Sequence, residues 1–446
     1  MSSVNRRAGW SVRVASIGVL AILIVATAAC GPEPAAVSPD RALSSAPTTT
    51  FTLSPTPTNA PEPSVNPSPI QEPPANPSPA PDPPAPPLRA PDPAGRVRAN
   101  ALGRLSGNWV FVGKQVPYPH NIWAEVQVWA IPLAAGVPRV AFAYDVSLGG
   151  VPEAIFDNAP YLRRQFSPDG TRVVVSVNGG LVVVDLTSGQ VQPLGVSGYF
   201  PSWSKDGSRI AYLFYLPVDQ VVPPEEAIFL VAASGGPAKE IARVGYRRQS
   251  VEWSPDGSML LVAQPDGMAI VDAANGKVVR RLTEVASYGS SFAQWTLGTP
   301  QITIASGDCD QTTTKLVGLD DVTAPVRTLL DTDERCPTLT VQDPRWNPAS
   351  PRELLYVATR AQPGAMPHDY RAHLFDIRSG RDTTLPLSAY EATWTWDGAK
   401  IVYVAKSATG FYGDAVRLWP RDGSDERVLV TAGANEFFFS LASLSY

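Results

Sequence analysis

The chain has 446 residues, including 46 Pro and 34 Gly. Lys and Arg total 36 against 41 Asp and Glu, and the resulting net charge of −5 at pH 7 excludes a nucleic-acid binder that relies on bulk positive charge. Because three Cys and three His are too few for a multi-residue Cys/His metal site, we expect no metal and no other cofactor.

The first 29 residues have the layout of a secretory signal peptide. Three arginines among the first 13 residues precede an apolar run, Val14–Ala29, whose last three residues are small. A charged start, an apolar middle and small residues at the cleavage point predict export and removal of residues 1–29. The run is shorter than the roughly twenty residues that a spanning helix needs, and a retained membrane helix is the alternative.

Cys30 follows these small residues directly, although Thr27 stands where Leu, Val or Ile is usual. This stretch resembles the signal of bacterial lipoproteins, in which the cysteine after the cleavage point is acylated. The resemblance implies a lipid anchor at Cys30 and a location on the outer side of a bacterial membrane, facing the periplasm or the exterior. Two or more acyl chains on one residue would make the attachment stable.

Residues 30–103 are expected to be a lipidated Cys followed by a disordered linker. Of the 46 prolines, 21 lie between Gly31 and Val97, where large apolar residues are isolated. Such a composition buries too little apolar area to offset the entropy of ordering, and Pro-rich chains are extended. We interpret the segment as a spacer. The alternative is a ligand for aromatic grooves, since Pro-x-x-Pro spellings occur.

Beyond residue 103 the sequence becomes a repeat of short apolar runs separated by Gly, Asp and Pro turns. An aromatic residue and a polar turn recur every 37 to 51 residues ahead of such a run, at Phe166, Trp203, Trp253, Trp295, Trp346 and Trp394. Each unit continues with a second run, a Gly turn and a last run, which makes four strands. A four-stranded sheet cannot bury both faces alone, so we expect an all-β fold of radially stacked sheets, a β-propeller.

The two ends of this region set the expected number of repeats. The first unit, Asn108–Tyr144, has three runs and no aromatic lead, whereas Phe439 lies 45 residues after Trp394, where a seventh lead is due. We therefore expect residues 104–446 to form a seven-bladed propeller closed by the C-terminal strand. Six or eight blades are the alternatives.

The spelling Trp-Ser-Pro-Asp-Gly at residues 253–257, with its following strand, resembles the TolB-type propeller repeat, which also occurs in dipeptidyl and prolyl peptidases. The resemblance covers about three quarters of the chain. It implies a periplasmic or surface platform for protein contacts. We expect neither the α/β domain that precedes the propeller in TolB nor the hydrolase domain that follows it in the peptidases.

The topology of such a blade predicts where a binding surface lies. The loop between the second and third strands lies at the same end as the link to the next blade, and the Asp-Gly turns lie at the other end. Exposed aromatic and His side chains on the longer loops indicate binding, with packing of each ring on its own blade as the alternative. The residues expected on this rim are Tyr118, His120, Trp123, His368, Tyr370, Phe411 and Tyr412.

Charged residues on the innermost strands are expected near the mouth of the central channel. Mixed charge there suits a peptide or a sugar, and a solvated channel lining is the alternative. These residues are Arg163, Arg164, Asp343, Arg345, Glu391 and Glu436. Cys309 and Cys336 fall on the same rim, and in an exported protein we expect a disulfide between them, with two free thiols as the alternative.

Sequence patterns of catalysis are missing. We find no Gly-x-Ser-x-Gly elbow, phosphate-binding loop or zincin pattern, and Asp206, Asp256 and Asp397 are expected to be turn residues. We therefore expect that the chain is not an enzyme but a monomeric, membrane-tethered platform that binds a protein or cell-envelope component. The competing hypothesis is a glycan or ester hydrolase that uses channel carboxylates such as Asp343 and Glu391. A structural envelope spacer is a third.

Overall fold

The computed structural model describes residues 94–445 except 119–122, 135, 148–161, 217–224, 246–250, 265–266, 284–291, 296–301, 307–313, 320–321, 333–339, 361–368, 407–412, 423 and 434–435. The expected signal peptide 1–29, the lipidation site Cys30 and the linker up to residue 93 lie outside the described residues. Cys309 and Cys336 lie outside them as well. Within the described part of the chain, no helix is long and apolar enough to cross a bilayer.

Antiparallel strands make up nearly all the regular structure of the described residues, which confirms the predicted all-β fold. The helices found there are the short η1 (Ala94–Arg96) and α2 (Leu162–Gln165). Most strands carry buried Val, Ile and Leu on both faces, as in β5 and β24. Strands of this kind must be covered on both sides, so their sheets have to pack face to face.

Three of the sheets have four strands each, and a fourth sheet has three. Their strands are β5 (Arg172–Val177), β6 (Gly180–Asp185) and β7 (Val191–Ser197); β8 (Tyr199–Trp203), β9 (Arg209–Tyr215), β10 (Glu225–Ala232) and β11 (Lys239–Gly245); β12 (Val251–Trp253), β13 (Met259–Gln264), β14 (Gly267–Asp272) and β15 (Val278–Leu282); and β16 (Phe292–Trp295), β17 (Ile302–Ser306), β18 (Thr314–Leu319) and β19 (Arg327–Thr332).

The other strands form one continuous path, β1-β4-β3-β2-β27-β25-β24-β23-β22-β21-β20, with β26 paired to β25. Their bounds are β1 (Val97–Ala99), β2 (Asn108–Pro117), β3 (Trp123–Pro132), β4 (Arg139–Ser147), β20 (Thr340–Asn347), β21 (Ser350–Arg360), β22 (Asp369–Asp376), β23 (Arg381–Trp394), β24 (Lys400–Lys406), β25 (Gly413–Pro420), β26 (Arg427–Thr431) and β27 (Phe437–Ser445). Strand β23 pairs with β22 through its first half and with β24 through its second half. The path therefore contains the four-stranded groups β4-β3-β2-β27, β23-β22-β21-β20 and β26-β25-β24-β23.

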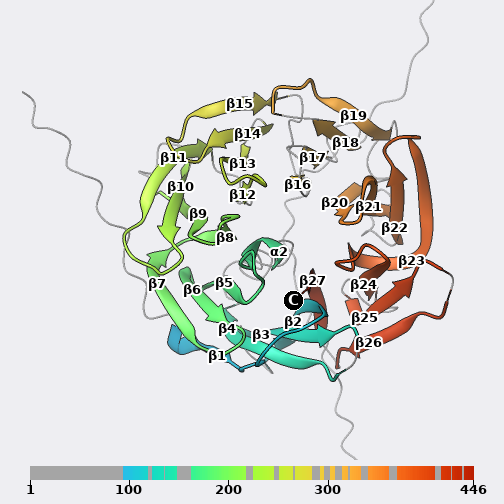
Figure 1. Cartoon of the computed structure of the whole chain (residues 1–446), viewed down its shortest axis with the longest axis horizontal. Coiled ribbons are helices and arrows are strands. Elements are labelled where there is room, and N and C mark those ends of the chain that lie inside the picture. The colour runs from blue at the N-terminus through green and yellow to red at the C-terminus, as the bar shows by residue number, and fades with distance from the viewer. Residues whose placement is uncertain are drawn as a thin grey trace, which may run out of the picture. The chain divides into compact units, whose positions relative to one another are not determined.

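The sheets follow one another in chain order around a common centre, with β8, β12, β16, β20, β27 and α2 innermost (Figure 1). Neighbouring sheets share apolar clusters. One cluster joins β2–β4 to β5 and β6, and another joins β8–β10 to β12–β14. A further cluster contains Val402 and Val416 of β24 and β25 together with Val110 and Ile131 of β2 and β3. This is the arrangement of a β-propeller.

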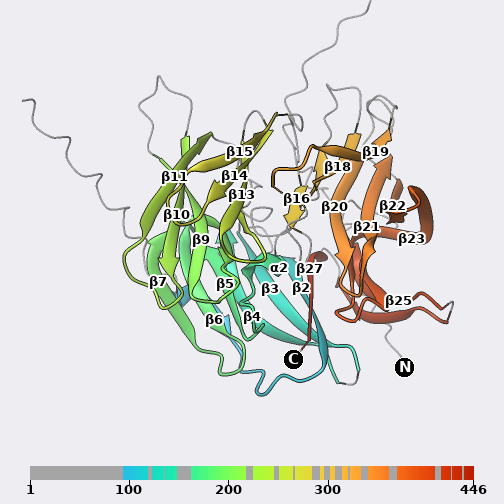
Figure 2. The same ribbon diagram turned by 45° about the horizontal axis from the view of Figure 1, so that its top comes forward.

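The C-terminal strand β27 pairs with β2, so the two ends of the repeat region lie in one sheet (Figure 2). The register pairs Trp109 with Leu444 and Gly113 with Phe439. Gly113 is required here, because a Cβ atom at that position would lie 2.5 Å from the Phe439 ring. The sequence-based pairing of the last strand with the first unit is therefore observed in the register.

The Ser-x-Asp-Gly turns repeat the same hydrogen bonds. The Ser204 hydroxyl donates to Asp206 at 2.6 Å and accepts from the Arg209 amide at 2.9 Å. Gly207 donates to the Ser204 carbonyl and has a φ of 70°, which glycine adopts without a Cβ clash. Equivalent contacts recur at Ser167, Ser254 and Thr395. These bonds lower the pKa of Asp206 to about 2, so the residue is an ionised turn acceptor, as the sequence predicts.

The described residues include the last part of the range assigned to the linker. Strand β1 adds a further strand to the outer edge of β4, and Val97 is buried there. After it, the Leu102 amide donates to the carbonyl of Leu186, which follows β6, at 2.8 Å. Residues 97–103 therefore connect the sheet of β2–β4 to the sheet of β5–β7.

Candidate functional site

The two ends of the sheets carry different connections. At the turn end lie the Ser-x-Asp-Gly turns, such as residues 204–208. The opposite ends of the strands, such as the last residues of β9 and β11, define the loop end, and the longer connections that follow these strands, residues 217–224 and 246–250 among them, lie outside the described residues. Because antiparallel strands alternate in direction, this separation follows from the strand order alone. A surface built from variable loops on a rigid set of strands is where function usually resides.

Five charged residues on inner elements come together, and we call them the central charge cluster. They are Arg163, Arg164, Glu252, Arg345 and Glu391. Helix α2 supplies two of them, and β12, β20 and β23 supply one each. Figure 1 places α2, β12 and β20 around the common centre. The cluster thus joins elements that belong to four different strand groups.

Arg164 and Glu252 form the first ion pair of the cluster. Arg164 Nη2 lies 2.7 Å from Glu252 Oε2, and the two side chains are 15% and 16% exposed. This oxygen is buried, and a backbone hydrogen bond from Trp295 also acts on the Glu252 carboxylate. Burial raises the pKa of Glu252, while Arg164, Arg163 and Arg345 act to lower it, and the net shift is upward.

Arg345 and Glu391 form the second pair, at 3.6 Å between Nη2 and Oε1, and both side chains are buried. The same Glu391 oxygen accepts the Leu441 amide of β27 at 2.7 Å. The register of β27 shifts beside this bond, at Ser440, so Glu391 satisfies a backbone donor at a bulge. Glu391 therefore ties β23 to the C-terminal strand in addition to pairing with Arg345.

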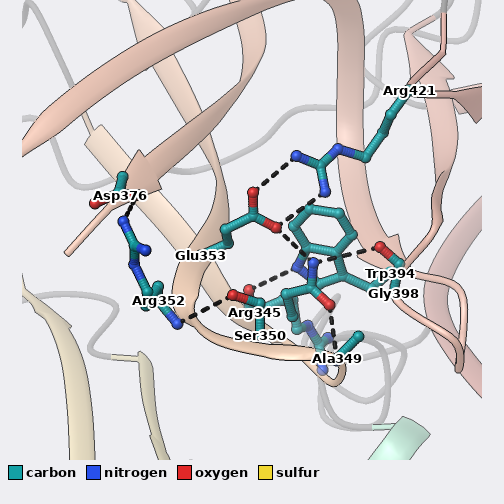
Figure 3. A network of polar contacts seen from close by, with 10 residues as sticks. Arg345, Ala349, Ser350, Arg352, Glu353, Asp376, Trp394, Gly398 and Arg421 are labelled. Carbon is teal, nitrogen blue, oxygen red and sulfur yellow. Dashed lines mark hydrogen bonds and ion pairs between the residues drawn. The ribbon is translucent and has the colours of Figure 1, made fainter. Parts of the chain in front are cut away.

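The backbone of Arg345 is fixed by a joint between β20–β22 and β23–β25 (Figure 3). The Trp394 indole donates to the Arg345 carbonyl at 3.0 Å. Arg421 lies over the Trp394 ring and makes two bonds to Glu353, at 2.8 and 2.9 Å. The hydrogen bond from Arg421 is the main cause of the lowered pKa of Glu353. Because each group has a partner across the joint, this network is structural and positions Arg345.

Two of the predicted residues lie at the loop end outside the cluster. Glu436 pairs with Lys114 at 2.5 Å, and although burial opposes the shift, bonds from Lys114 and the Gly433 amide lower the pKa of Glu436. The Tyr118 hydroxyl donates to Asp145 at 2.7 Å and the ring remains 36% exposed. Tyr118 is therefore an exposed aromatic held in one orientation.

The position of Tyr370 differs from the expectation of an exposed rim aromatic. It lies in β22, is 8% exposed and packs beside Tyr390, with the ring planes tilted and the centroids 5.7 Å apart. Lys406 lies over its ring at 5.2 Å. The alternative interpretation, an aromatic that packs on its own blade, holds for this residue. The reason is that β22 begins one residue before Tyr370, so strand pairing turns the ring inward.

Several predicted residues cannot be placed. His120, His368, Phe411 and Tyr412 lie outside the described residues, and Trp123 and Asp343 lie in β3 and β20 with undescribed side chains. The sequence analysis missed Glu252, although it stands directly before a lead Trp, as Arg345 does. Within the described part of the chain, no group of three His, Cys, Asp or Glu residues is placed to hold a metal ion.

No family model matches the chain, and no curated protein matches its sequence. Solved structures do match its fold. An oligogalacturonate lyase in complex with manganese has a TM-score of 0.45 and 9% identity over 74% of this chain and 86% of that one. TolB from Acinetobacter baumannii has a TM-score of 0.40 and 16% identity over 75% of this chain and 82% of that one. A prolyl endopeptidase has a TM-score of 0.45 and 11% identity over 72% of this chain and 50% of that one.

These matches correct one expectation. Missing catalytic motifs led to the prediction that the chain is not an enzyme, but the matched structures include a lyase and a prolyl endopeptidase. The prediction was therefore wrong as an inference, because this type of sheet arrangement occurs in enzymes as well as in TolB. At this level of identity the similarity concerns the fold and assigns no reaction to this chain.

Proposed function

We propose that the chain is a lipid-anchored, extracytoplasmic propeller that binds a protein or another cell-envelope component through its loop end. Residues 1–29 direct export, Cys30 carries the anchor, and the Pro-rich segment up to residue 103 holds the monomeric propeller away from the membrane. A Cys309–Cys336 disulfide stabilises the loop end. The propeller has seven blades, and the pairing of β27 with β2 closes it.

The observation that carries the binding function is the difference between the two ends of the sheets. At the turn end, the polar side chains of the repeated turns bond to their own backbone, as Ser204 and Asp206 do. At the loop end, the Tyr118 ring is exposed and its hydroxyl donates to Asp145, and Glu436 pairs with Lys114. Aromatic and Arg side chains in such a setting are enriched at interfaces.

In-cell photo-crosslinking tests this proposal. A photoreactive amino acid at Tyr118 or Arg163 should form adducts with one partner, because both positions belong to the loop end. The controls are Trp396 and Val428, which are 49% and 50% exposed and lie towards the turn end. Adducts from the loop end alone support the proposal. Adducts from Trp396 and Val428 alone, or from no position, would contradict it.

A second candidate is an envelope hydrolase that uses carboxylates of the central charge cluster. Glu252 favours it, because a buried carboxyl with a raised pKa beside arginines is the setting of many general acids. Glu391 is less suited, since it accepts the Leu441 amide. Hydrolysis of a glycan or ester panel by the full-length chain, and its loss in Glu252→Gln, would establish this function. Equal turnover by the wild type and Glu252→Gln would exclude Glu252 as a catalytic residue and with it this function.

A further inference from the structure

Residues 97–103, which we call the strap, are an addition that the repeat does not require. Their strand β1 pairs with the outer edge of β4, and Val97 is buried there. Within the described residues, the sheets that end in β7, β11, β15 and β19 carry no further strand at that edge. The contacts of the strap therefore indicate its role better than the blade pattern does.

The strap is held along its length by hydrogen bonds to two sheets. The Asn100 amide donates to the carbonyl of Ala141 in β4 at 2.8 Å. Further along, the Leu102 amide donates to the Leu186 carbonyl at 2.8 Å, and the Leu102 carbonyl accepts from the Arg139 guanidinium at 2.8 Å. Because the strap is fixed at both ends, its side chains have defined positions.

Arg98 of the strap joins two carboxylates of the first sheet. It donates hydrogen bonds of 3.0 and 3.2 Å to the two oxygens of Asp145 in β4, and one of 2.6 Å to Glu125 in β3. A two-bond contact of this kind fixes the orientation of a carboxylate as well as its charge. The hydrogen bond from Arg98 is the main cause of the lowered pKa of Asp145, although burial opposes the shift.

Asp145 in turn holds the exposed Tyr118 at the loop end. The Tyr118 hydroxyl donates to Asp145 Oδ1 at 2.7 Å, and Arg98 Nη2 donates to the same oxygen at 3.0 Å. An exposed side chain that is already fixed in one orientation pays a smaller entropic cost when a partner binds to it. The contacts thus run from the strap through one carboxylate to an aromatic of the proposed binding surface.

We propose that the strap positions Tyr118 for the partner, so that the docking of residues 97–103 on β4 controls binding at the loop end. The proposal rests on the binding function above and adds a regulation of it. Arg98 is a positioning residue, because it acts through Asp145 and Tyr118. The strap follows the Pro-rich segment directly in the sequence, so whatever draws residues 97–103 away from β4 also releases this aromatic.

Two possible roles of Arg98 predict opposite changes in the pKa of Tyr118. The hydrogen bond to Asp145 raises this pKa, because it favours the protonated phenol, whereas the charge of Arg98 lowers it. If Arg98 holds Asp145 in place, removal of Arg98 breaks the hydrogen bond, and the pKa of Tyr118 falls. If Arg98 acts through its charge alone, its removal lets the pKa of Tyr118 rise further.

The test replaces Tyr118 of the full-length chain by 3-fluorotyrosine and follows the fluorine signal by NMR during a pH titration. The wild type is compared with Arg98→Gln, Arg98→Lys and Val97→Asp. Val97→Asp places a charge at the buried position of β1 and should detach the strap. Circular dichroism verifies that each variant is folded. Arg98 is half exposed, so its variants serve the test if Val97→Asp does not fold.

The matched control is Arg352→Gln. Arg352 pairs with Asp376 at 3.0 Å, and the two side chains are 53% and 31% exposed. The Arg98–Asp145 pair has the same distance and exposures of 52% and 34%. The control therefore removes an equivalent ion pair that lies outside the strap.

We expect the pKa of Tyr118 to fall in Arg98→Gln and in Val97→Asp and to stay at the wild-type value in Arg352→Gln. Arg98→Lys keeps the charge but loses the two-bond contact, so it should shift the pKa in the same direction by less. A raised or unchanged pKa of Tyr118 in Arg98→Gln would overturn the positioning role. An unchanged pKa in folded Val97→Asp would overturn the control by the strap.

Photo-crosslinking from Arg163, as described above, separates this proposal from the binding function. Most adducts should be lost in Arg98→Gln and should persist in Arg352→Gln. Undiminished adducts in Arg98→Gln would overturn the control of binding by the strap and leave the binding function standing. Adducts from no position of the wild type would contradict the binding function, whereas the fluorine titration would still decide whether Arg98 positions Tyr118.

Discussion

The indole of Trp394 donates a hydrogen bond of 3.0 Å to the main-chain carbonyl of Arg345, 49 positions earlier in the chain. Trp253 makes the same bond, also at 3.0 Å, to the carbonyl of Ser202, 51 positions earlier. In both cases the acceptor directly precedes the lead Trp of an earlier sheet. The lead aromatics thus join neighbouring sheets through a polar contact as well as through their packed rings.

This bond predicts different costs for two otherwise similar substitutions. Trp253→Phe keeps most of the ring but removes the donor to Ser202, whereas the buried Trp203 indole has no hydrogen-bond partner in the described structure. We expect Trp253→Phe to lower the free energy of unfolding by about 1 kcal/mol more than Trp203→Phe does. Denaturant unfolding of both variants measures the difference. Equal losses would show that the bond contributes nothing.

The Glu353–Arg421 pair predicts a pH-dependent stability. The hydrogen bond from Arg421 lowers the pKa of Glu353 in the folded state, so its contribution is present above the unfolded pKa and is lost as the pH falls through the folded one. Thermal unfolding between about pH 7 and pH 3 should therefore show Glu353→Gln least stable relative to the wild type at neutral pH, with the gap closing in acid.

The control for this measurement is Glu240→Gln. Glu240 pairs with Arg243, whose side chain is 55% exposed, so solvent screens the pair and the variant should match the wild type throughout. A gap between wild type and Glu353→Gln that stays constant down to acid pH would contradict the electrostatic role of Glu353.

Gly189 and Gly380 occupy the same Ser-Gly turn in two different sheets, with φ angles of 72° and 69°. Replacing either by Ala should cost about 1–2 kcal/mol because of the left-handed backbone. At Gly189 the new Cβ would also lie 2.8 Å from the Ala101 amide nitrogen, whereas at Gly380 nothing lies within 4 Å. We therefore expect Gly189→Ala to be the more destabilising of the two in chemical unfolding. Equal costs would mean that residues 97–103 do not hold this position.

The proposed lipid anchor predicts a localisation change. Cys30→Ser removes the thiol that would be acylated but leaves the apolar run before it intact. We expect metabolic labelling of the variant with a fatty acid to disappear. The variant should move from the membrane fraction to the soluble extracytoplasmic fraction if residues 1–29 are removed, and stay in the membrane fraction if they remain attached. Fatty-acid labelling of Cys30→Ser, together with a membrane fraction that stays unchanged although residues 1–29 have been removed from the variant, would contradict acylation at this cysteine.

Local patterns allowed most of the strand order to be predicted. The Ser-x-Asp-Gly turn closes over six residues through its own hydrogen bonds, as from Ser204 to Arg209, so its spelling alone determines its structure. The lead Trp residues and the apolar runs after them mark the inner strands for the same reason. The pairing of Phe439 with the first unit followed from the regular spacing of these leads.

Contacts between distant segments could not be read from the sequence. Val97 and Leu102 follow a Pro-rich stretch, and their burial depends on β4 and on the chain after β6. Glu252 has no local mark of its role, because its partner Arg164 is more than eighty positions away. Tyr370 was predicted to lie on an exposed loop, but strand β22 already begins at Asp369, so Tyr370 is a strand residue.

The central claim is that the first and last strands of the repeat region share one sheet. Residues Asn108 and Ser445 are paired across β2 and β27, where paired Cα atoms lie about 4.5–5.5 Å apart, within reach of a disulfide. In a chain whose native cysteines are replaced by serine, cysteines at 108 and 445 should cross-link on oxidation and raise the unfolding temperature. Cysteines at 108 and 442 should not cross-link, because residue 442 pairs with residue 111. No cross-link at 108 and 445, or an equal one at 108 and 442, would contradict the account.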